Sequence, residues 1–258
     1  EGVVKDGDTY VCKGFETVAD YKLKCHVFST IGSHGSLTVE QALMNSCNPY
    51  MIHLALEMGN SRFAYYQSLF GFGKITGIDL PGETTGIVYG DRMTTIDAAC
   101  NSFGQTINVN MMQMMAAYCS IINGGMLSQP HIVKRIESAN GEVVKEYKAN
   151  LVRQTITAST SKLLRRYLKN TVEEGTAKKA GVTGYSVAGK TGTAQKGDRK
   201  DNKWIISFIG HAPAENPKFA IYVVIDEPYG TTGTSGSSAD VLTLTHNILE
   251  KLLPYMNV

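Results

Sequence analysis

The sequence predicts an α+β fold, in which a helical subdomain precedes a C-terminal antiparallel sheet flanked by helices. Three β-prone runs lie near the C-terminus, and their short, polar or Pro-containing connections favour antiparallel pairing. Apolar residues in the middle of the chain recur at helical spacing, and a further amphipathic helix closes the chain. Helices that precede a separate antiparallel sheet are typical of α+β folds. The three runs are YSVAGKTGTAQ, KWIISFIGHAP and KFAIYVVIDEP.

Short alternating runs such as YKLKCHVF predict that residues 1–36 form a β-rich excursion. A helix then begins in SLTVEQALMNSCN, where Ser36 or Thr38 supplies the N-terminal cap. PYMIHLALEMG predicts a second helix, because Pro49 suits a first helical turn and Gly59 suits a helix end. SRFAYYQSLFGFG predicts a third helix that stops at its glycines.

Loops and helices continue through the middle of the chain. Residues 77–88 contain Pro-Gly and predict a loop, and NVNMMQMMAAYCSIINGG predicts an apolar helix whose four methionines fill the core. HIVKRIESANGEVVKEYK predicts a hairpin, because Asn-Gly is the strongest two-residue turn signal. TASTSKLLRRYLKNTVEEG predicts an amphipathic helix that ends at Gly175, and ADVLTLTHNILEKLLPY predicts the closing helix.

The composition argues against several classes of function. The chain has 258 residues and a net charge of +2, so it presents no strong positive field to nucleic acid or to a membrane surface. No Gly-rich phosphate loop is visible, and we expect no cofactor. No apolar run reaches the roughly 18–20 residues of a membrane helix, and no signal peptide is visible. Because the first residue is Glu1 and not Met, we expect a fragment of a longer protein, whose anchor would lie upstream.

The five cysteines are odd in number and too widely spaced for a dense disulfide scaffold. Cys12 and Cys25 lie in a polar stretch together with His26 and His34. Thiolate and imidazole are ligands that zinc prefers, so this group is a candidate zinc site. The spacing matches no compact Cys-x-x-Cys pattern, so two unpaired thiols or one disulfide are the alternatives.

The stretch AGKTGTAQ, in the first β-prone run, has the residue types of one wall of a serine acyl-transfer site. Lys190 offers a positive charge, and the hydroxyls of Thr191 and Thr193 can bind a carboxylate. Gly192 lets a substrate backbone approach the strand, and the Thr193 N–H can serve an oxyanion hole. A Lys-Thr-Gly triplet alone is a weak signal, because a surface strand with a lysine and a turn glycine gives the same letters.

A second polar element, Ser46-Cys47-Asn48, lies in the connection between the first two predicted helices. The Ser46 hydroxyl can relay a proton and the Asn48 amide can bind a substrate amide, if both point into one cleft. Taken by itself, this element is better explained as a helix end followed by a capping Asn.

Together and in this order, the two elements match motifs of penicillin-binding proteins and class A β-lactamases, which also carry Ser-x-x-Lys. FGFGKITGIDLPGE, VEEGTAKKA and WIISFIGHAPAENPKFAIYVVID are further matches, so nearly the whole chain resembles a class B penicillin-binding protein. The resemblance is greatest to elongation-type and sporulation-specific (stage V sporulation protein D-like) transpeptidases. Two residues depart from the family's pattern: Cys47 within Ser-x-Asn, and Thr106, where the family often has Gly.

The resemblance implies a penicillin-binding-protein/β-lactamase-like fold, with residues 1–258 forming a transpeptidase domain that lacks its N-terminal part. In the intact protein, a serine would attack the penultimate D-Ala of a stem peptide, release the last D-Ala and pass the acyl group to a neighbouring amine. The implied partners are peptidoglycan stem peptides and β-lactams, at the extracytoplasmic face of the bacterial cell membrane. The implied catalytic residues are Ser46, Asn48 and Lys190, and the implied substrate-binding residues are Thr191, Gly192 and Thr193.

The serine of Ser-x-x-Lys is missing from the expected place, since no such motif precedes Ser46. One match exists, Ser159-Thr160-Ser161-Lys162, and a serine one helical turn from a lysine is the required spacing. We reject it because it follows Ser-x-Asn, because short motifs recur by chance, and because it starts a charged amphipathic helix. We expect instead that the chain is cut just after the motif and is inactive. A β-lactamase or D,D-carboxypeptidase relative and a binding module without its serine are the alternatives.

Overall fold

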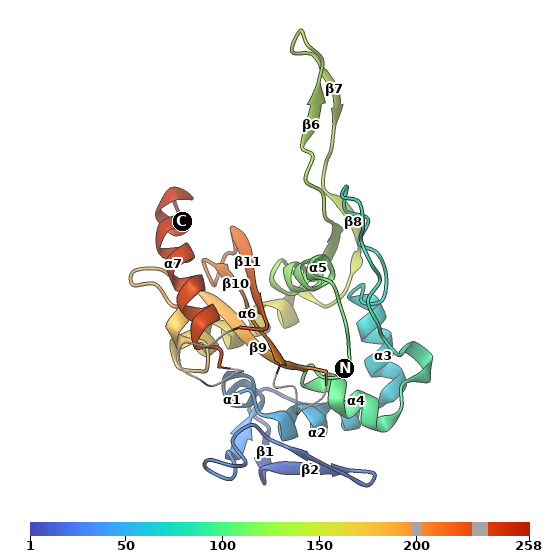
Figure 1. The fold of residues 1–258 in the computed structure, drawn as a ribbon, viewed down its shortest axis with the longest axis vertical. Coiled ribbons are helices and arrows are strands. Elements are labelled where there is room, and N and C mark those ends of the chain that lie inside the picture. Colours follow the sequence, from blue (N-terminus) through green and yellow to red (C-terminus); the bar gives the residue numbers. More distant parts are fainter. Residues whose placement is uncertain (198–202, 229–236) are drawn as a thin grey trace.

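The computed structural model describes residues 1–197, 203–228 and 237–258. It has the predicted α+β architecture, with helices in the first half and an antiparallel sheet near the C-terminus (Figure 1). The helices are α1 (Val39–Met44), α2 (Asn48–Met58), α3 (Asn60–Leu69), α4 (Thr95–Ser102), α5 (Met111–Ile122), α6 (Ala158–Glu173) and α7 (Ala239–Tyr255). The strands are β1 (Thr9–Cys12), β2 (Phe15–Val18), β3 (Tyr21–Lys24), β4 (Gly35–Thr38), β5 (Met126–Gln129), β6 (Arg135–Glu137), β7 (Val143–Glu146), β8 (Asn150–Gln154), β9 (Ala188–Lys196), β10 (Lys203–Ala212) and β11 (Phe219–Asp226).

The three predicted β runs form one sheet in the order β11-β10-β9, with both pairs antiparallel. Side chains alternate across this sheet, as the strand period requires. Ile206 and Phe208 of β10 belong to a core cluster with Val241 and Leu249 of α7. Ile209 of the same strand packs into a second cluster that includes residues from α5 and α6. The sheet is therefore covered by α7 on one face and by α5 and α6 on the other.

The helices of the first half begin where their caps are. Thr38 caps α1 and forms a capping box with Gln41, which decides between the two predicted cap residues. Pro49 occupies the first turn of α2, as predicted, and Gly59 ends that helix at φ 80°, a backbone conformation that favours glycine. Asn110 caps α5 through a second reciprocal box with Gln113.

One prediction about a helix interior is wrong in detail. The four methionines of α5 do not form its buried face, because Met111 is half exposed and the others are only partly buried. The buried residues of that helix are Gln113, Ala117, Tyr118, Ser120 and Ile122. The cap of α6 is Thr157, the first residue of the predicted helix, and it lies two residues before Ser159.

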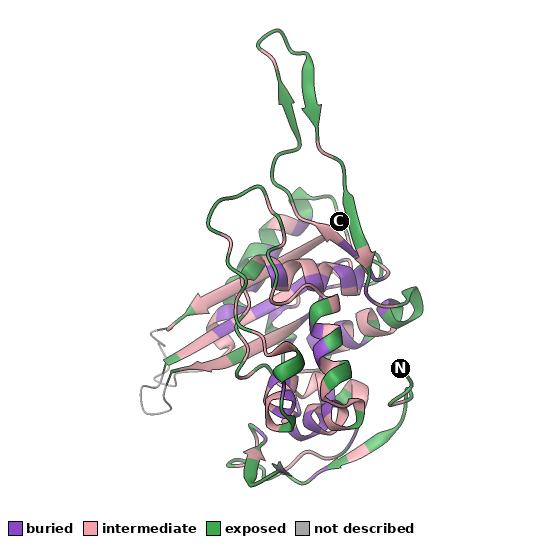
Figure 2. Cartoon of the chain, turned by 90° about the vertical axis from the view of Figure 1, so that its right-hand side faces the viewer, coloured by how far each residue is buried: buried purple, intermediate pink, exposed green. Residues whose placement is uncertain are grey.

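Two parts of the molecule stand apart from the main core. Residues 9–38 form two small sheets, β1 with β4 and β2 with β3, which pack beside α1 and α2 (Figure 1). The hairpin of β6 and β7 projects far from the body, and both of its strands are exposed (Figure 2). Within the described residues, we find no helix whose length and hydropathy would suit a membrane span.

Candidate active site

The structure brings the two predicted motifs into direct contact. The Nζ of Lys190 on β9 donates a hydrogen bond to the Oγ of Ser46 at 2.5 Å, although the two residues are 144 positions apart. Ser46 lies in the turn between α1 and α2 and has φ 53°, a left-handed conformation that non-glycine residues rarely adopt. Such strain is retained where the surrounding structure holds the residue in place. The turn therefore presents the Ser46 hydroxyl to the sheet.

Two threonines complete a polar cluster around this contact. Lys190 Nζ also donates to the carbonyl oxygen of Thr191 at 3.1 Å and lies 3.4 Å from the Thr191 hydroxyl. The Thr176 hydroxyl lies 3.4 Å from both the Ser46 hydroxyl and the Thr191 hydroxyl. One ammonium and three hydroxyls thus meet between α1, β9 and the segment after α6.

Thr176 is a site residue that sequence reasoning missed. Its backbone N–H donates to the carbonyl oxygen of Met44 at 3.0 Å, which joins the segment after α6 to the last turn of α1. Gly175 makes this close approach possible, since a Cβ there would lie 2.8 Å from the Met44 oxygen. The sequence signal for this contact is Gly175 followed by a hydroxyl residue. By itself, that glycine predicts only a helix end.

The Lys190 ammonium is partly buried and has no carboxylate partner among the residues that the structure describes. Burial removes water from the charged form, so the pKa of Lys190 falls to about 8. The lysine therefore still carries most of its charge at neutral pH, and its polar contacts in the described structure are two hydroxyls and one carbonyl oxygen, all uncharged. Such a site favours an anionic ligand that brings its own negative charge.

Asn48 is the first residue of α2, and its side-chain amide donates to the carbonyl oxygen of Lys24 at 3.2 Å. The alternative of a capping Asn is wrong, because the cap position belongs to Cys47, whose side chain makes no capping bond. The amide instead ties the start of α2 to the end of β3. Asn48 therefore sits beside Ser46 in the chain but is held by the β-rich segment.

The remaining predicted residues follow Lys190 along β9. Thr193 is exposed and lies opposite Ile206 of β10. Gly192 has a structural reason to be glycine, because a Cβ there would lie 2.6 Å from the Ser207 Oγ. In the order β11-β10-β9 this strand is an edge of the described sheet, so its outer backbone faces no neighbouring strand of that sheet.

The rejected Ser-x-x-Lys match has local roles at the start of α6. The Ser159 hydroxyl lies 2.9 Å from the hydroxyl of the cap residue Thr157, and Lys162 is exposed. Ser161 is buried and donates to the carbonyl oxygen of Ile121 at 2.6 Å. None of these contacts involves Ser46 or Lys190.

The predicted cysteine and histidine group does assemble, with one change of member. His34 Nδ1 lies 3.5 Å from the sulfur of Cys25 and 4.0 Å from that of Cys12. The fourth member is Cys47, whereas the ring of His26 bonds the carbonyl oxygen of Asn45. A hydrogen bond with Cys47 lowers the pKa of the Cys25 thiol to about 5, and the same pairing raises the pKa of Cys47.

Comparison with known proteins gives one consistent result. Residues 1–250 match the family described as the penicillin binding protein transpeptidase domain. Stage V sporulation protein D of Bacillus subtilis is 39% identical over 256 residues, which is 97% of this chain and 39% of that protein. The peptidoglycan D,D-transpeptidase FtsI of Escherichia coli is 32% identical over 212 residues, or 81% of this chain and 34% of that protein. The chain thus spans about two fifths of the length of such relatives or less.

Solved structures agree with the sequence comparison. Penicillin-binding protein 3 of Mycobacterium tuberculosis, in complex with aztreonam, has a TM-score of 0.87 and 28% identity, and the match covers 100% of this chain and 59% of that one. The D,D-transpeptidase domain of a peptidoglycan glycosyltransferase from Eggerthella lenta has a TM-score of 0.85 and 25% identity over 98% of this chain and 61% of that one.

Proposed function

Because the chain belongs to the penicillin-binding protein transpeptidase domain family, we propose that it carries two walls of a peptidoglycan D,D-transpeptidase site. The reaction is cross-linking of cell-wall peptides through a serine acyl-enzyme. The observation that carries the proposal is the 2.5 Å contact between Lys190 and Ser46, which unites two motifs that are weak signals apart. Chance motifs in unrelated parts of a fold have no reason to meet.

The Lys190 wall binds the terminal carboxylate of the donor peptide. The ammonium has only uncharged partners among the described residues, two hydroxyls and a carbonyl oxygen, so a carboxylate supplies the missing counter-charge. The Thr191 hydroxyl lies beside the ammonium, Thr193 follows two residues later on β9, and the free edge of this strand accepts the extended peptide backbone. Specificity for a peptide that ends in a free carboxylate follows from this arrangement.

The Ser46 wall relays the proton and binds the donor peptide. In the first step, the nucleophilic serine oxygen bonds to the penultimate D-Ala carbonyl carbon, and the peptide C–N bond breaks. The serine proton passes to the leaving amine of terminal D-Ala, and the Ser46 hydroxyl lies in contact with Lys190 to relay it. In the second step, an acceptor amine displaces the serine, which regains its proton. Asn48 holds the amide of the donor peptide once it exchanges its Lys24 partner.

We assign the nucleophilic serine and its lysine to a part of the protein outside residues 1–258. In the one Ser-x-x-Lys of these residues, the Ser159 hydroxyl contacts the hydroxyl of the helix cap Thr157, and Lys162 is exposed. The curated relatives are more than twice as long as this chain, so they have room for the motif elsewhere. Residues 1–258 alone are then expected to be inactive.

The proposal also covers the ligands of the site, the cellular location of the domain and its biological role. Penicillin-binding protein 3 structures contain aztreonam and ampicillin, and we propose that β-lactams and stem peptides bind this site as well. Action on peptidoglycan puts the domain at the extracytoplasmic face of the membrane, held by an anchor outside this chain. The 39% identity to stage V sporulation protein D favours a sporulation role.

The direct test is turnover of a stem pentapeptide by the intact protein, with D-Ala release and cross-linked product measured together. We expect both products, and a loss of about 100-fold or more in rate for Lys190→Ala. Lys196→Ala is the matched control, because Lys196 lies on the same strand and pairs with surface carboxylates. Its rate should stay near that of the unmodified protein.

The same assay, together with a measurement of β-lactam hydrolysis, separates the alternatives. D-Ala release without cross-linked product would identify a D,D-carboxypeptidase, and rapid β-lactam hydrolysis would identify a β-lactamase. A folded intact protein that releases no D-Ala would be a peptide-binding module. Any of these results would contradict the proposal.

A further inference from the structure

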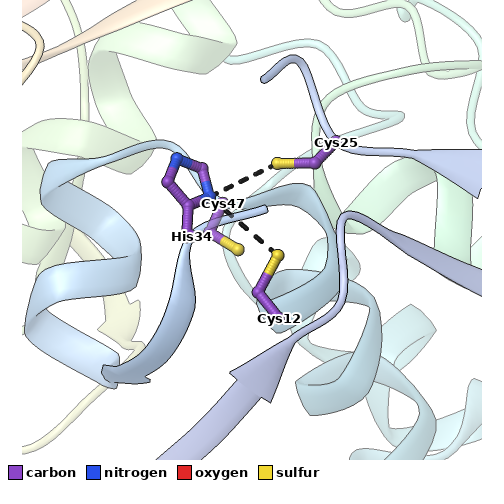
Figure 3. A group of neighbouring side chains, drawn as sticks. All are labelled: Cys12, Cys25, His34 and Cys47. Carbon is purple, nitrogen blue, oxygen red and sulfur yellow. Dashed lines mark hydrogen bonds between the residues drawn. The ribbon is translucent and has the colours of Figure 1, made fainter. Parts of the chain in front are cut away.

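Four side chains from separate parts of the chain converge next to the Ser46 turn (Figure 3). Cys12 ends β1, Cys25 follows β3, His34 precedes β4, and Cys47 is the cap position of α2. Their three sulfurs and the His34 Nδ1 all lie within 4.8 Å of one another. The cluster draws on both small sheets and on the helix that starts the Ser46-Cys47-Asn48 wall.

Two of the separations are close to those of a tetrahedral metal site, and the four ligand atoms all lie within 4.8 Å of one another. Zinc bonds to sulfur at about 2.3 Å and to imidazole nitrogen at about 2.0–2.1 Å, so neighbouring ligand atoms lie roughly 3.5–3.8 Å apart. The two measured sulfur to Nδ1 distances are 3.5 and 4.0 Å. Cys12, Cys25 and Cys47 are at most 3% exposed, as in a closed structural site that leaves no position for substrate.

A backbone N–H already donates to one of the sulfurs. The N–H of Gly14 donates to Cys12 Sγ at 3.3 Å, across a spacing of two residues. Such donors offset the negative charge that thiolate ligands carry, and outer partners of this kind orient metal ligands. Neutral thiols packed in an apolar cluster carry no negative charge for such donors to offset.

The β-rich segment has too few buried residues of its own to hold its two small sheets together. Within residues 1–36, the buried residues are Cys12, Gly14, Val18 and Cys25. Isolated two-stranded sheets are marginal in water, and small modules of this kind depend on disulfides or metals. A bound ion would join both sheets to α2 through one centre.

We propose that Cys12, Cys25 and Cys47, as thiolates, and His34, through Nδ1, bind one structural zinc ion. The ion fastens the β-rich segment to the Ser46-Cys47-Asn48 turn. Three soft thiolates with one imidazole suit zinc rather than magnesium or calcium. This site is separate from the transpeptidase chemistry, so it stands or falls independently of the proposed function. It also accounts for Cys47, one of the two departures from the family's pattern.

Metal analysis of the full chain tests the site. The chain is purified under reducing conditions with zinc supplied, and zinc is measured after dialysis. We expect about one zinc per chain and at least a tenfold loss of affinity in Cys12→Ala, Cys25→Ala, Cys47→Ala and His34→Ala. Cys100→Ala and His26→Ala are matched controls that remove a thiol and a neighbouring imidazole outside the cluster, and they should keep the zinc.

A second measurement avoids variants that fail to fold. Cadmium added to the unmodified metal-free chain should produce thiolate-to-metal absorption that stops rising at about one equivalent. Zinc loading should also raise the melting temperature of the unmodified chain and of Cys100→Ala alike. The proposal is overturned if zinc does not stay bound, if cadmium absorption shows no plateau, or if mass spectrometry finds a disulfide among Cys12, Cys25 and Cys47 in the zinc-supplied protein.

Discussion

Lys190 is the residue on which the site depends, because its charge is held without an acidic partner in the described structure. Burial favours its neutral form, so the folded pKa of about 8 lies below that of an exposed lysine. The ammonium is present below pH 8 and is lost as the pH rises through that value.

We therefore predict that one lysine of the chain titrates near pH 8 in NMR spectra of lysine side chains, and that this signal is absent from Lys190→Met. In the intact protein, acylation by a carboxylate-bearing β-lactam should slow about tenfold for each pH unit above 8, because neutral lysine no longer attracts the carboxylate. A Lys190 signal that titrates above pH 10 would contradict the assigned burial.

His211 predicts a second pH effect, on stability. Its ring is buried between the Tyr118 hydroxyl at Nδ1, 2.8 Å away, and the Ala214 carbonyl oxygen at Nε2, 3.1 Å away. This pair of contacts suits a neutral ring, and burial lowers the pKa of His211 to about 4. The unfolded chain binds a proton below about pH 6.5, so stability should fall by up to about 3 kcal/mol between pH 6.5 and 4.

Urea unfolding across this pH range measures the effect. His211→Asn should flatten the pH dependence, whereas His131→Gln, at an exposed histidine, should leave it unchanged. Equal slopes for all three proteins would show that His211 does not carry the effect.

At the residue scale, the motif positions of Ser46, Asn48 and Lys190 were readable from sequence because their letters and order are distinctive. Thr176 and the inclusion of Cys47 in the cysteine cluster were not, since both depend on contacts between distant segments. At Thr106 the departure from the family's pattern was readable from the sequence, but the backbone conformation there was not. This residue has φ 61°, a backbone conformation that favours glycine, and its hydroxyl accepts a bond from the Asn101 amide.

At the scale of elements, the critical junction is the one between the end of α6 and the end of α1. Gly175 allows it, because a Cβ would meet the backbone oxygens of Met44 and Thr171 at 2.8 Å each. Backbone atoms cannot move aside as a flexible side chain can. Thr176 would then be pushed away from Ser46.

Gly175→Ala should therefore destabilise the chain by about 1–3 kcal/mol, the range for an overpacked contact. Gly181→Ala is the control, since its nearest atom would be 3.3 Å away and it too lacks a positive φ. Chemical denaturation compares the two. A Gly175→Ala variant as stable as the Gly181→Ala variant would show that the junction is loose.

The type of an element was predictable where its residue pattern agreed with its cap or turn residues, as in α1, α2 and the β6–β7 hairpin. The buried face of α5 was not, because methionine and glutamine contradict their usual preferences there. Gln113 is buried and donates to the carbonyl oxygens of Lys74 and Thr85, so a polar residue takes the inner position. Hydrophobicity alone assigns that face to the methionines.

At the scale of the whole molecule, the chain joins three bodies around one small polar site. The antiparallel sheet supplies Lys190 and the threonines of β9, the α1–α2 turn supplies Ser46 and Asn48, and the β-rich segment supports that turn from outside. The sequence predicted the sheet and the helices, whose signals are local. The way in which the β-rich segment meets α2 is a long-range contact with no local signal.

The central claim is that this site serves an acyl-enzyme formed on a serine outside residues 1–258. The measurement that tests it most directly is labelling of the intact protein and of residues 1–258 with fluorescent penicillin, followed by peptide mass spectrometry of the labelled residue. We predict that the intact protein is labelled on the serine of an upstream Ser-x-x-Lys, more slowly in Lys190→Ala, and that residues 1–258 stay unlabelled. Label on Ser46 or Ser159, or on residues 1–258 alone, would contradict the account.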